Sequence, residues 1–230
     1  MSAEFTNVNQ GGVSSLPAPL AGSHPSLHGL PGLSKRLFDL SFALLGLVLA
    51  LPVMLAIAVL IKLDSPGPVL FKQRRVGLNG REFWMYKFRT MGVDAEARHR
   101  ELLAYNEMKD GVIFKMSNDP RVTKIGRILR RSSLDELPQL YNVIRREMSL
   151  IGPRPLPTYE VAKHEPHHLK RLGVLPGCTG LWQVSGRNQI DSFHKMVELD
   201  LTYIQNWSVA YDWQILFRTV TAVFTATGSC

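Results

Sequence analysis

One long apolar run stands out from a chain whose other segments mix apolar and polar residues. No charged side chain occurs between Leu40 and Ile61, and a helix of about 22 residues is long enough to cross a bilayer. Pro52 lies in the middle of the run, where it removes a backbone donor and clashes with the preceding turn. The pattern predicts either a re-entrant helix that breaks near Pro52 and returns, or a bitopic span with a proline kink.

The flanks of this run favour the re-entrant alternative. Lys35 and Arg36 precede it, and Lys62 with further basic residues follows it. Because basic flanks favour the cytoplasmic side, both ends are expected on that side. The predicted divisions are a disordered tail at 1–33 without a cleavable signal peptide, a re-entrant membrane helix at 34–64, and a cytoplasmic domain at 65–230.

Two strand-like runs follow the apolar segment. Val69–Val76 and Arg81–Arg89 flank a turn that contains Asn79–Gly80, a dipeptide typical of β-hairpins. Both runs interleave basic and aromatic side chains, a pattern that can bind single-stranded nucleic acid. Directly after an apolar anchor, it favours anionic headgroups or a phosphate pocket instead.

The remaining periodic segments predict helices. The expected helices are an exposed one at Asp94–Lys109, a short basic one at Val122–Arg131, an amphipathic one at Phe193–Gln205, and an interfacial or core helix at Val209–Ala226.

Some polar residues in and between these segments fit either a functional role or an ordinary surface or capping role. Asp200 could be functional, but it also fits a solvated or capping acid. His164, His167 and His168 lie in a polar stretch without the spacing of a metal site, so they are expected at the surface.

The net charge indicates which class of molecule the protein binds, and the cysteines bear on disulfide and zinc sites. The net charge of +8 and the pI of about 9.7 point to an anionic partner such as a phosphorylated substrate, an acidic membrane surface or nucleic acid. Two distant cysteines indicate neither a disulfide framework nor a zinc site.

A basic run ending at Arg131 leads to an adjacent acid pair, Asp135 and Glu136. Ser133 and Glu136 fit a capping box, whereas Pro138 favours Asp135 as the cap. Either arrangement places Asp135 at a helix start, which keeps a carboxylate ionised and attracts phosphate. An ionised aspartate beside phosphate can attack phosphorus and form an acyl phosphate. The pattern alone fits a structural cap or a nucleophile.

Two further motifs carry arginines suited to phosphate. Prolines on both sides fix Arg154 in the segment GPRP, which would present its guanidinium rigidly. The Gly-rich segment Leu175–Asn188 contains Arg187, but it matches neither a Walker A loop nor a dinucleotide fingerprint.

Taken together, these motifs resemble the bacterial sugar transferases, specifically the small monotopic phosphoglycosyl transferases, from about Ser34 to Phe224. Within this group the likeness is greatest to the exopolysaccharide-initiating galactosyl-phosphate transferases. The segments that carry the resemblance are SPGPVLFKQ, YKFRTM, DPRVTK, SLDELPQL, EMSLIGPRP, PGCTGLWQVSGRN and LDLTYIQNWS.

The resemblance implies a fold and a reaction. The fold is α+β: a re-entrant helix-break-helix, a β-hairpin, and a mostly helical cytoplasmic catalytic domain with amphipathic surface helices. The reaction transfers a sugar-1-phosphate from a UDP-sugar to undecaprenyl phosphate and releases UMP, with Mg²⁺ and a covalent intermediate. Asp135 would be the nucleophile and a metal ligand, and Glu136 would assist the incoming lipid phosphate. The implied phosphate-binding residues are Lys87, Arg130, Arg154 and Arg187.

The chain departs from the family at the helix break, where Leu51 stands before Pro52 in place of serine. The implied location is the cytoplasmic face of the inner membrane among phospholipids, without nucleic acid, and a homo-oligomer is left open. Galactose is the expected sugar, with glucose and N-acetylated sugars as alternatives. A catalytically silent membrane scaffold of the same fold is the competing function.

Overall fold

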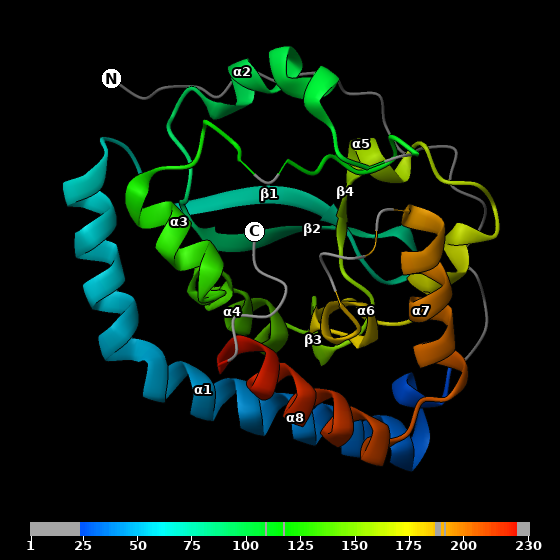
Figure 1. The fold of residues 1–230 in the computed structure, drawn as a ribbon. Coiled ribbons are helices and arrows are strands. Elements are labelled where there is room, and N and C mark those ends of the chain that lie inside the picture. Colours follow the sequence, from blue (N-terminus) through cyan, green and yellow to red (C-terminus); the bar gives the residue numbers. More distant parts are fainter. Residues whose placement is uncertain (1–23, 109, 117, 187–189, 191, 225–230) are drawn as a thin grey trace.

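The computed structural model describes residues 24–108, 110–116, 118–186, 190 and 192–224, and it has the predicted α+β fold. A three-stranded antiparallel sheet lies at the centre, and the long helix α1 runs below it and up one side (Figure 1). The helices are α1 Gly29–Asp64, α2 Ala95–Leu102, α3 Lys124–Arg131, α4 Gln139–Ile144, α5 Thr158–Val161, α6 Leu181–Val184, α7 Phe193–Gln205 and α8 Val209–Phe224. The strands are β1 Leu70–Val76, β2 Glu82–Phe88, β3 Ser149–Ile151, β4 Leu156–Pro157 and β5 Gly177–Thr179.

The predicted hairpin is confirmed as β1 and β2. The strands pair antiparallel from Leu70 opposite Phe88 to Val76 opposite Glu82. Asn79 has a φ of 52° and Gly80 a φ of 79°, the left-handed conformations that favour Asn and Gly in such turns. β4 pairs with the other edge of β1, so the segment after Arg154 joins the sheet that carries Lys87.

α1 is one continuous helix that contains Pro52. Figure 1 shows that it changes direction, with its first part alongside α8 and its second part rising towards α3. It is long and apolar enough to cross a membrane, and an 18-residue stretch within it has a mean hydropathy of 3.0. Most of its large apolar side chains face outward, among them Val48, Leu49 and Leu55. These features agree with membrane association.

The first part of α1 is held in the domain by a buried polar network. The Lys35 ammonium lies 2.8 Å from Asp212 of α8 and 3.4 Å from Asp39. Asp39 accepts hydrogen bonds from Ser149 Oγ and the backbone N–H of Leu150. This network joins α1, α8 and β3, so one face of the N-terminal part of the helix packs into the domain.

The second part of α1 packs on the same domain. Ile57 and Ile61 are buried in a cluster with Phe88 of β2 and Leu129 of α3. At the end of the helix, Arg89 Nη2 donates to the carbonyl oxygen of Ser65 over 2.8 Å. Both ends of the apolar segment are therefore bonded to one folded unit.

Some predicted boundaries differ from the structure. The helix begins at Gly29 rather than Ser34, so residues 29–33 are helical and not part of a tail, while residues 1–23 lie outside the described part. The exposed helix expected at Asp94–Lys109 ends as α2 at Leu102 and continues as the 3-10 turn Leu103–Tyr105. α7 has the predicted bounds, and α8 agrees as far as the described residues extend.

Glycines allow two loops to touch backbone to backbone. A Cβ on Gly177 would lie 2.1 Å from the Gly152 nitrogen, and a Cβ on Gly180 would lie 2.3 Å from the Gly152 oxygen. The Gly152 N–H donates to Thr179 O over 2.9 Å. Within the described residues, the Gly-rich segment thus supports the loop that carries Arg154.

Candidate active site

The end of β2 and the helix α3 bring Arg130 to the hairpin. A Cβ on Gly126 would lie 2.0 Å from the Thr90 oxygen, so only glycine lets α3 approach the strand end this closely. One turn later, Arg130 Nε donates to Thr90 Oγ1 over 3.0 Å. The basic helix is therefore fixed against the strand that also carries Lys87.

The acid pair lies in the 3-10 helix Leu134–Glu136, between α3 and α4. Ser133 holds the N-cap position of this 3-10 helix, as one alternative predicted, but neither predicted capping arrangement forms. Ser133 adopts a left-handed φ of 55° and makes no side-chain capping bond, and Asp135 lies four residues before α4 begins. Pro138 directly precedes α4, where its missing N–H costs little. A turn, rather than a helix dipole, presents Asp135.

Glu136 is held by two of the predicted phosphate-binding residues. Its Oε1 lies 2.6 Å from Lys87 Nζ and 3.2 Å from Arg154 Nη2. All three side chains are less than one-fifth exposed. The structure thus unites an acid from the turn, a lysine from β2 and an arginine from the GPRP loop in one cluster.

The neighbouring Asp135 is buried, with 7% of its surface exposed. Burial raises the pKa of Asp135 and the adjacent Glu136 adds to this, while Lys87, Arg130 and Arg154 act in the opposite direction. The net direction is upward, in contrast to the ionising helix start expected from the sequence. A carboxylate of raised pKa is a stronger base and nucleophile once it is ionised.

Burial also lowers the pKa of the Lys87 ammonium, against the opposing effect of Glu136. Lys87 and Asp135 are thus each less readily charged than an exposed group, which is typical of catalytic clusters. An anionic ligand or metal ion would change this balance, because each acts directly on the charges that surround Asp135.

Asn142 fixes the acid pair relative to the strand, a role that the sequence did not reveal. Its Nδ2 donates to Trp84 O over 2.7 Å, and its Oδ1 accepts from Tyr86 N over 3.2 Å. Because Asn142 is on α4, these bonds tie the helix after the acid pair to the strand that carries Lys87.

Arg75 and Glu160 form a second part of the site that the sequence did not single out. Glu160, on α5, is buried, and its Oε2 has no hydrogen-bond partner among the described residues. Burial raises the pKa of Glu160 to about 7 against the opposing charge of Arg75. Burial, together with Arg154, lowers the pKa of Arg75 to about 10. These groups extend the charged cluster from Arg154 toward α5.

Asp200 is buried and supports the loop that carries Arg154. The interpretation of Asp200 as a solvated acid is therefore wrong. Asp200 forms a buried ion pair with Arg171, whose Nη2 lies 2.6 Å from Asp200 Oδ2. The same nitrogen donates to the carbonyl oxygen of Arg154 over 2.8 Å. Arg187, the weakest of the predicted phosphate-binding residues, lies outside the described residues.

The acid pair also lies beside the apolar helix. Leu134 and Leu137, on either side of it, pack against the cluster that contains Ile57 and Ile61 of α1. Leu140 lies close to α1 at Gly46, before Pro52. The segment that carries Asp135 therefore contacts the second part of α1, and α4, which follows it, contacts the first part.

The donor atoms present here fit Mg²⁺. Asp135 and Glu136 offer carboxylate oxygens, the hard ligands that this ion prefers, and Mg²⁺ is commonly held by one or two carboxylates together with substrate phosphates. Asp135 is the better candidate, because both Lys87 and Arg154 already engage Glu136 Oε1.

Comparison with known proteins agrees with the chemistry of this site. The bacterial sugar transferase family model matches residues 31–226. The chain is 45% identical over 197 residues to galactosyl transferase CpsE of Streptococcus agalactiae serotype III, a match that covers 86% of this chain and 43% of that protein.

Two further relatives differ in length. The exopolysaccharide production protein ExoY of Rhizobium meliloti is 43% identical over 203 residues, which cover 86% of this chain and 88% of ExoY. A UDP-glucose:undecaprenyl-phosphate glucose-1-phosphate transferase of Escherichia coli is 43% identical over 204 residues, which cover 84% and 41%. The chain thus spans less than half of the longer relatives and most of ExoY.

Proposed function

The chain belongs to the bacterial sugar transferase family, and we propose that it transfers a sugar-1-phosphate from a UDP-sugar to undecaprenyl phosphate and releases UMP. The observation that carries this proposal is the buried Asp135 beside Glu136, which Lys87 and Arg154 hold. Relatives named as galactose and glucose transferases support the reaction class. This would be the first membrane step of exopolysaccharide synthesis.

The proposed first half-reaction uses Asp135 as the nucleophile. A carboxylate oxygen of Asp135 attacks the phosphorus that bears the sugar, and the bond from that phosphorus to the bridging oxygen of UMP breaks. UMP leaves with the bonding electrons, and the sugar phosphate remains on Asp135 as an acyl phosphate. Bound Mg²⁺ would supply charge neutralisation on the diphosphate.

The cations of the site would serve the same step. Lys87, Arg130 and Arg154 surround Asp135 closely enough to affect its ionisation. Preorganised cations in a water-poor site stabilise developing phosphate charge more strongly than cations in water do. Since Lys87 and Arg154 already contact Glu136, they can bind donor phosphate without a large rearrangement.

The proposed second half-reaction returns the enzyme to its starting state. An oxygen of undecaprenyl phosphate attacks the same phosphorus, and the carboxylate of Asp135 leaves. Glu136 would orient the incoming phosphate. When that phosphate is protonated, Glu136 would also accept its proton. The acceptor is anchored in lipid, so the nucleophile must lie near the membrane surface. The contacts of Leu134 and Leu137 with the apolar α1 cluster support this placement.

The attachments of α1 at both ends support our proposal that it is re-entrant. Lys35 near its start and Ser65 just after its end each bond to the same domain. A folded domain lies on one side of a bilayer, so a helix that crosses it could not keep both sets of bonds. We therefore favour a helix that enters and leaves at the cytoplasmic face of the inner membrane, where UDP-sugars are made.

The test is UMP release by the full chain in detergent with undecaprenyl phosphate, Mg²⁺ and a panel of UDP-sugars. We expect galactose to be the preferred sugar and glucose to be second, with N-acetylated sugars weaker. Without acceptor, a donor labelled in the sugar should leave label on the protein, and Asp135→Asn should lose both label and turnover. Full activity in Asp135→Asn, or no UMP with any donor, contradicts the proposal; the second result would favour a silent scaffold.

Glu136→Gln separates the two half-reactions. If Glu136 assists the lipid phosphate, the variant should still acquire label from the donor, and transfer to undecaprenyl phosphate should slow by about 100-fold, a typical effect of losing an acid–base group. Equal slowing of both steps would assign Glu136 to the donor side instead.

A further inference from the structure

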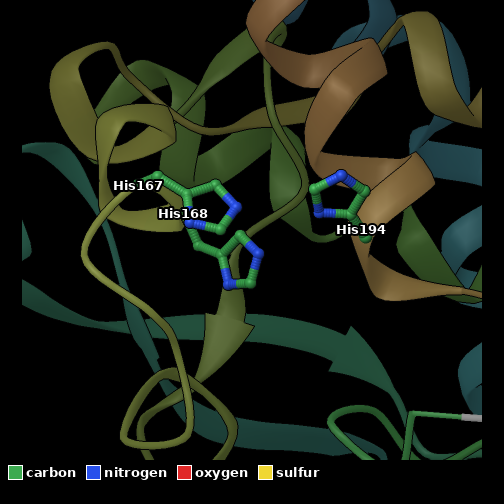
Figure 2. Close-up of side chains that lie close together, drawn as sticks. All are labelled: His167, His168 and His194. Carbon is green, nitrogen blue, oxygen red and sulfur yellow. The ribbon is translucent and has the colours of Figure 1, made fainter.

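Three histidines from two segments meet on the side of the domain near α7. His167 and His168 lie at the start of the 3-10 helix His168–Gly173, and His194 is in the first turn of α7. One ring nitrogen from each lies within 4.8 Å of the other two. Figure 2 shows the three rings turned toward one another across the gap between the segments.

We propose that His167, His168 and His194 bind one divalent transition-metal ion of the Zn²⁺ type. Imidazole nitrogens suit Zn²⁺, Ni²⁺ and Cu²⁺, whereas Mg²⁺ prefers oxygen. Three histidine ligands with a water in the fourth position is an established Zn²⁺ arrangement. The site is separate from the acid pair and from the Mg²⁺ chemistry proposed there.

Carboxylates next to the outer histidines favour this assignment. His167 Nδ1 lies 3.4 Å from Glu165 Oε2, and His194 Nε2 lies 3.3 Å from Glu198 Oε1. In metal sites, a carboxylate commonly accepts the N–H of the ligand's other nitrogen and thereby fixes its orientation. The metal would then take Nε2 of His167 and Nδ1 of His194.

His168 supplies the buried ligand. It is 6% exposed, and its Nε2 has no hydrogen-bond partner among the described residues. Its Nδ1 accepts the Glu165 N–H over 3.2 Å, so the neutral ring carries its proton on Nε2. To bind metal through Nε2, the ring must move this proton to Nδ1 and give up the long amide contact. No net proton is released, because the ring stays neutral.

The site must close slightly around the ion. Zn–N bonds of about 2.0–2.1 Å in a tetrahedron place ligand nitrogens roughly 3.4 Å apart, whereas one nitrogen of each ring lies within 4.8 Å of the others in this structure. His167 and His194 have side chains that are 44% and 59% exposed, so they can rotate inward without unpacking the interior.

The consequence of binding would be structural. The ion would join the segment of Arg171 to α7, the same two elements that the buried Arg171–Asp200 pair connects. Because Arg171 also binds the Arg154 carbonyl, this joint lies behind the GPRP loop. We therefore expect the ion to stabilise the fold rather than to react with substrate.

The experiment uses the full chain in detergent, free of any polyhistidine tag, treated with chelator and then titrated with Zn²⁺ while Mg²⁺ is in large excess. We expect one Zn²⁺ per chain and a rise in Tm of about 5 °C at roughly 100 times the Kd. Co²⁺ in place of Zn²⁺ should give the visible absorption of a four-coordinate ion.

Two variants and one control decide the outcome. His194→Gln and His167→Gln alter exposed or half-exposed side chains, and each should weaken Zn²⁺ binding by at least about 10-fold and remove the Tm rise. His28→Gln changes an exposed histidine far from the cluster in sequence and should leave both unchanged. No stoichiometric binding, or equal binding in His194→Gln and the unaltered chain, overturns the proposal.

Discussion

Lys87 Nζ lies 2.6 Å from Glu136 Oε1, and the same ammonium lowers the pKa of the neighbouring Asp135 against the effect of burial. Lys87 is on β2 and Glu136 is in the turn after α3, so the pair joins two separate parts of the fold. Among the groups that favour ionised Asp135, Lys87 has the largest effect. Its removal should therefore affect the chemistry in a direction that can be stated in advance.

The first prediction concerns Lys87→Met. In the proposed mechanism Lys87 faces the reacting phosphate, so its loss should reduce labelling of the enzyme by the donor by about 100- to 1,000-fold. Because Lys87 lowers the pKa of Asp135, its removal should raise that pKa further. The acid limb of the pH–rate profile for labelling should then move to higher pH. An acid limb that stays in place or moves to lower pH would contradict this assignment.

The second prediction concerns Glu160 and pH. Its pKa is about 7 in the folded chain against an ordinary 4.5. Between these values the unfolded chain has released the proton and the folded chain has not, so stability falls as pH rises from about 4.5 to 7. The loss should be roughly 3 kcal/mol and constant above that range.

Glu160→Gln should remove this dependence. The free energy of unfolding of the variant and of the unaltered chain should be measured by denaturation from pH 4.5 to 8. The contributions of other titrating groups cancel in the difference between the two free energies. Glu101→Gln, at an exposed position of α2, serves as the matched control and should keep the pH dependence of the unaltered chain. Parallel curves for Glu160→Gln and the unaltered chain would show that Glu160 is ionised in the folded state.

The third prediction concerns the contact between α3 and the strand end. Gly126→Ala places a Cβ 2.0 Å from Thr90 O, so α3 must move away and carry Arg130 with it. We expect a loss of about 1–3 kcal/mol in stability together with reduced activity. Gly173→Ala is the control, because a Cβ there meets nothing within 4 Å. Equal stability of the two variants would mean that α3 can shift without cost.

The fourth prediction separates stability from activity. Arg171→Leu leaves Asp200 buried without its partner and should cost about 3–5 kcal/mol. Adding Asp200→Leu should recover much of that loss, since two buried apolar groups replace an ion pair. Activity should stay low in the double variant, because the hydrogen bond from Arg171 to the Arg154 carbonyl is still missing. Full recovery of UMP release would show that this bond does not position Arg154.

The fifth prediction concerns topology. Single cysteines at Ser34 and Ser65, in a chain whose two native cysteines are replaced, should both react with a membrane-impermeant reagent from the cytoplasmic side alone. Both positions flank the apolar run. Ser34 precedes Lys35, which is paired with Asp212, and the Ser65 carbonyl accepts a hydrogen bond from Arg89. Glu101→Cys marks the side of the catalytic domain. Labelling of the two flanking positions from opposite sides would reject the re-entrant helix.

Local patterns explain which elements the sequence predicted well. The Asn79–Gly80 turn defines its hairpin with the two adjacent strands, and α7 follows from apolar spacing within one segment. Pro52 was expected to break the apolar helix, but α1 is continuous across it and only changes direction along its length (Figure 1).

The rest of the site depends on contacts between distant segments. Asp135 was expected at the start of an α-helix, but Ser133 takes a left-handed conformation and a three-residue 3-10 helix forms there instead. The pKa of Glu160 is raised by burial, against the opposing charge of Arg75. Arg75 lies 85 positions earlier in the chain, so no local pattern could reveal this contact. His194 comes from a helix outside the segment that holds His167, so spacing within either segment could not reveal the cluster.

His168 was likewise expected at the surface and is buried. The polar residues around His168 form no periodic pattern that would predict burial. Its ring packs against Phe193 of α7, with ring centroids 5.0 Å apart. A buried histidine in a polar stretch is the kind of residue that single-sequence patterns cannot distinguish from a solvated one.

The attachment of α1 at both ends has a consequence for how the enzyme can be divided. Lys35 neutralises Asp212 inside the domain, and Ile57 and Ile61 cover Phe88 and Leu129. Excising the helix would leave the buried Asp212 without its cation and an apolar surface open, so the remainder should aggregate rather than become a water-soluble enzyme. An unrelated membrane tether could not replace it. The anchor is a part of the catalytic fold and not an interchangeable module.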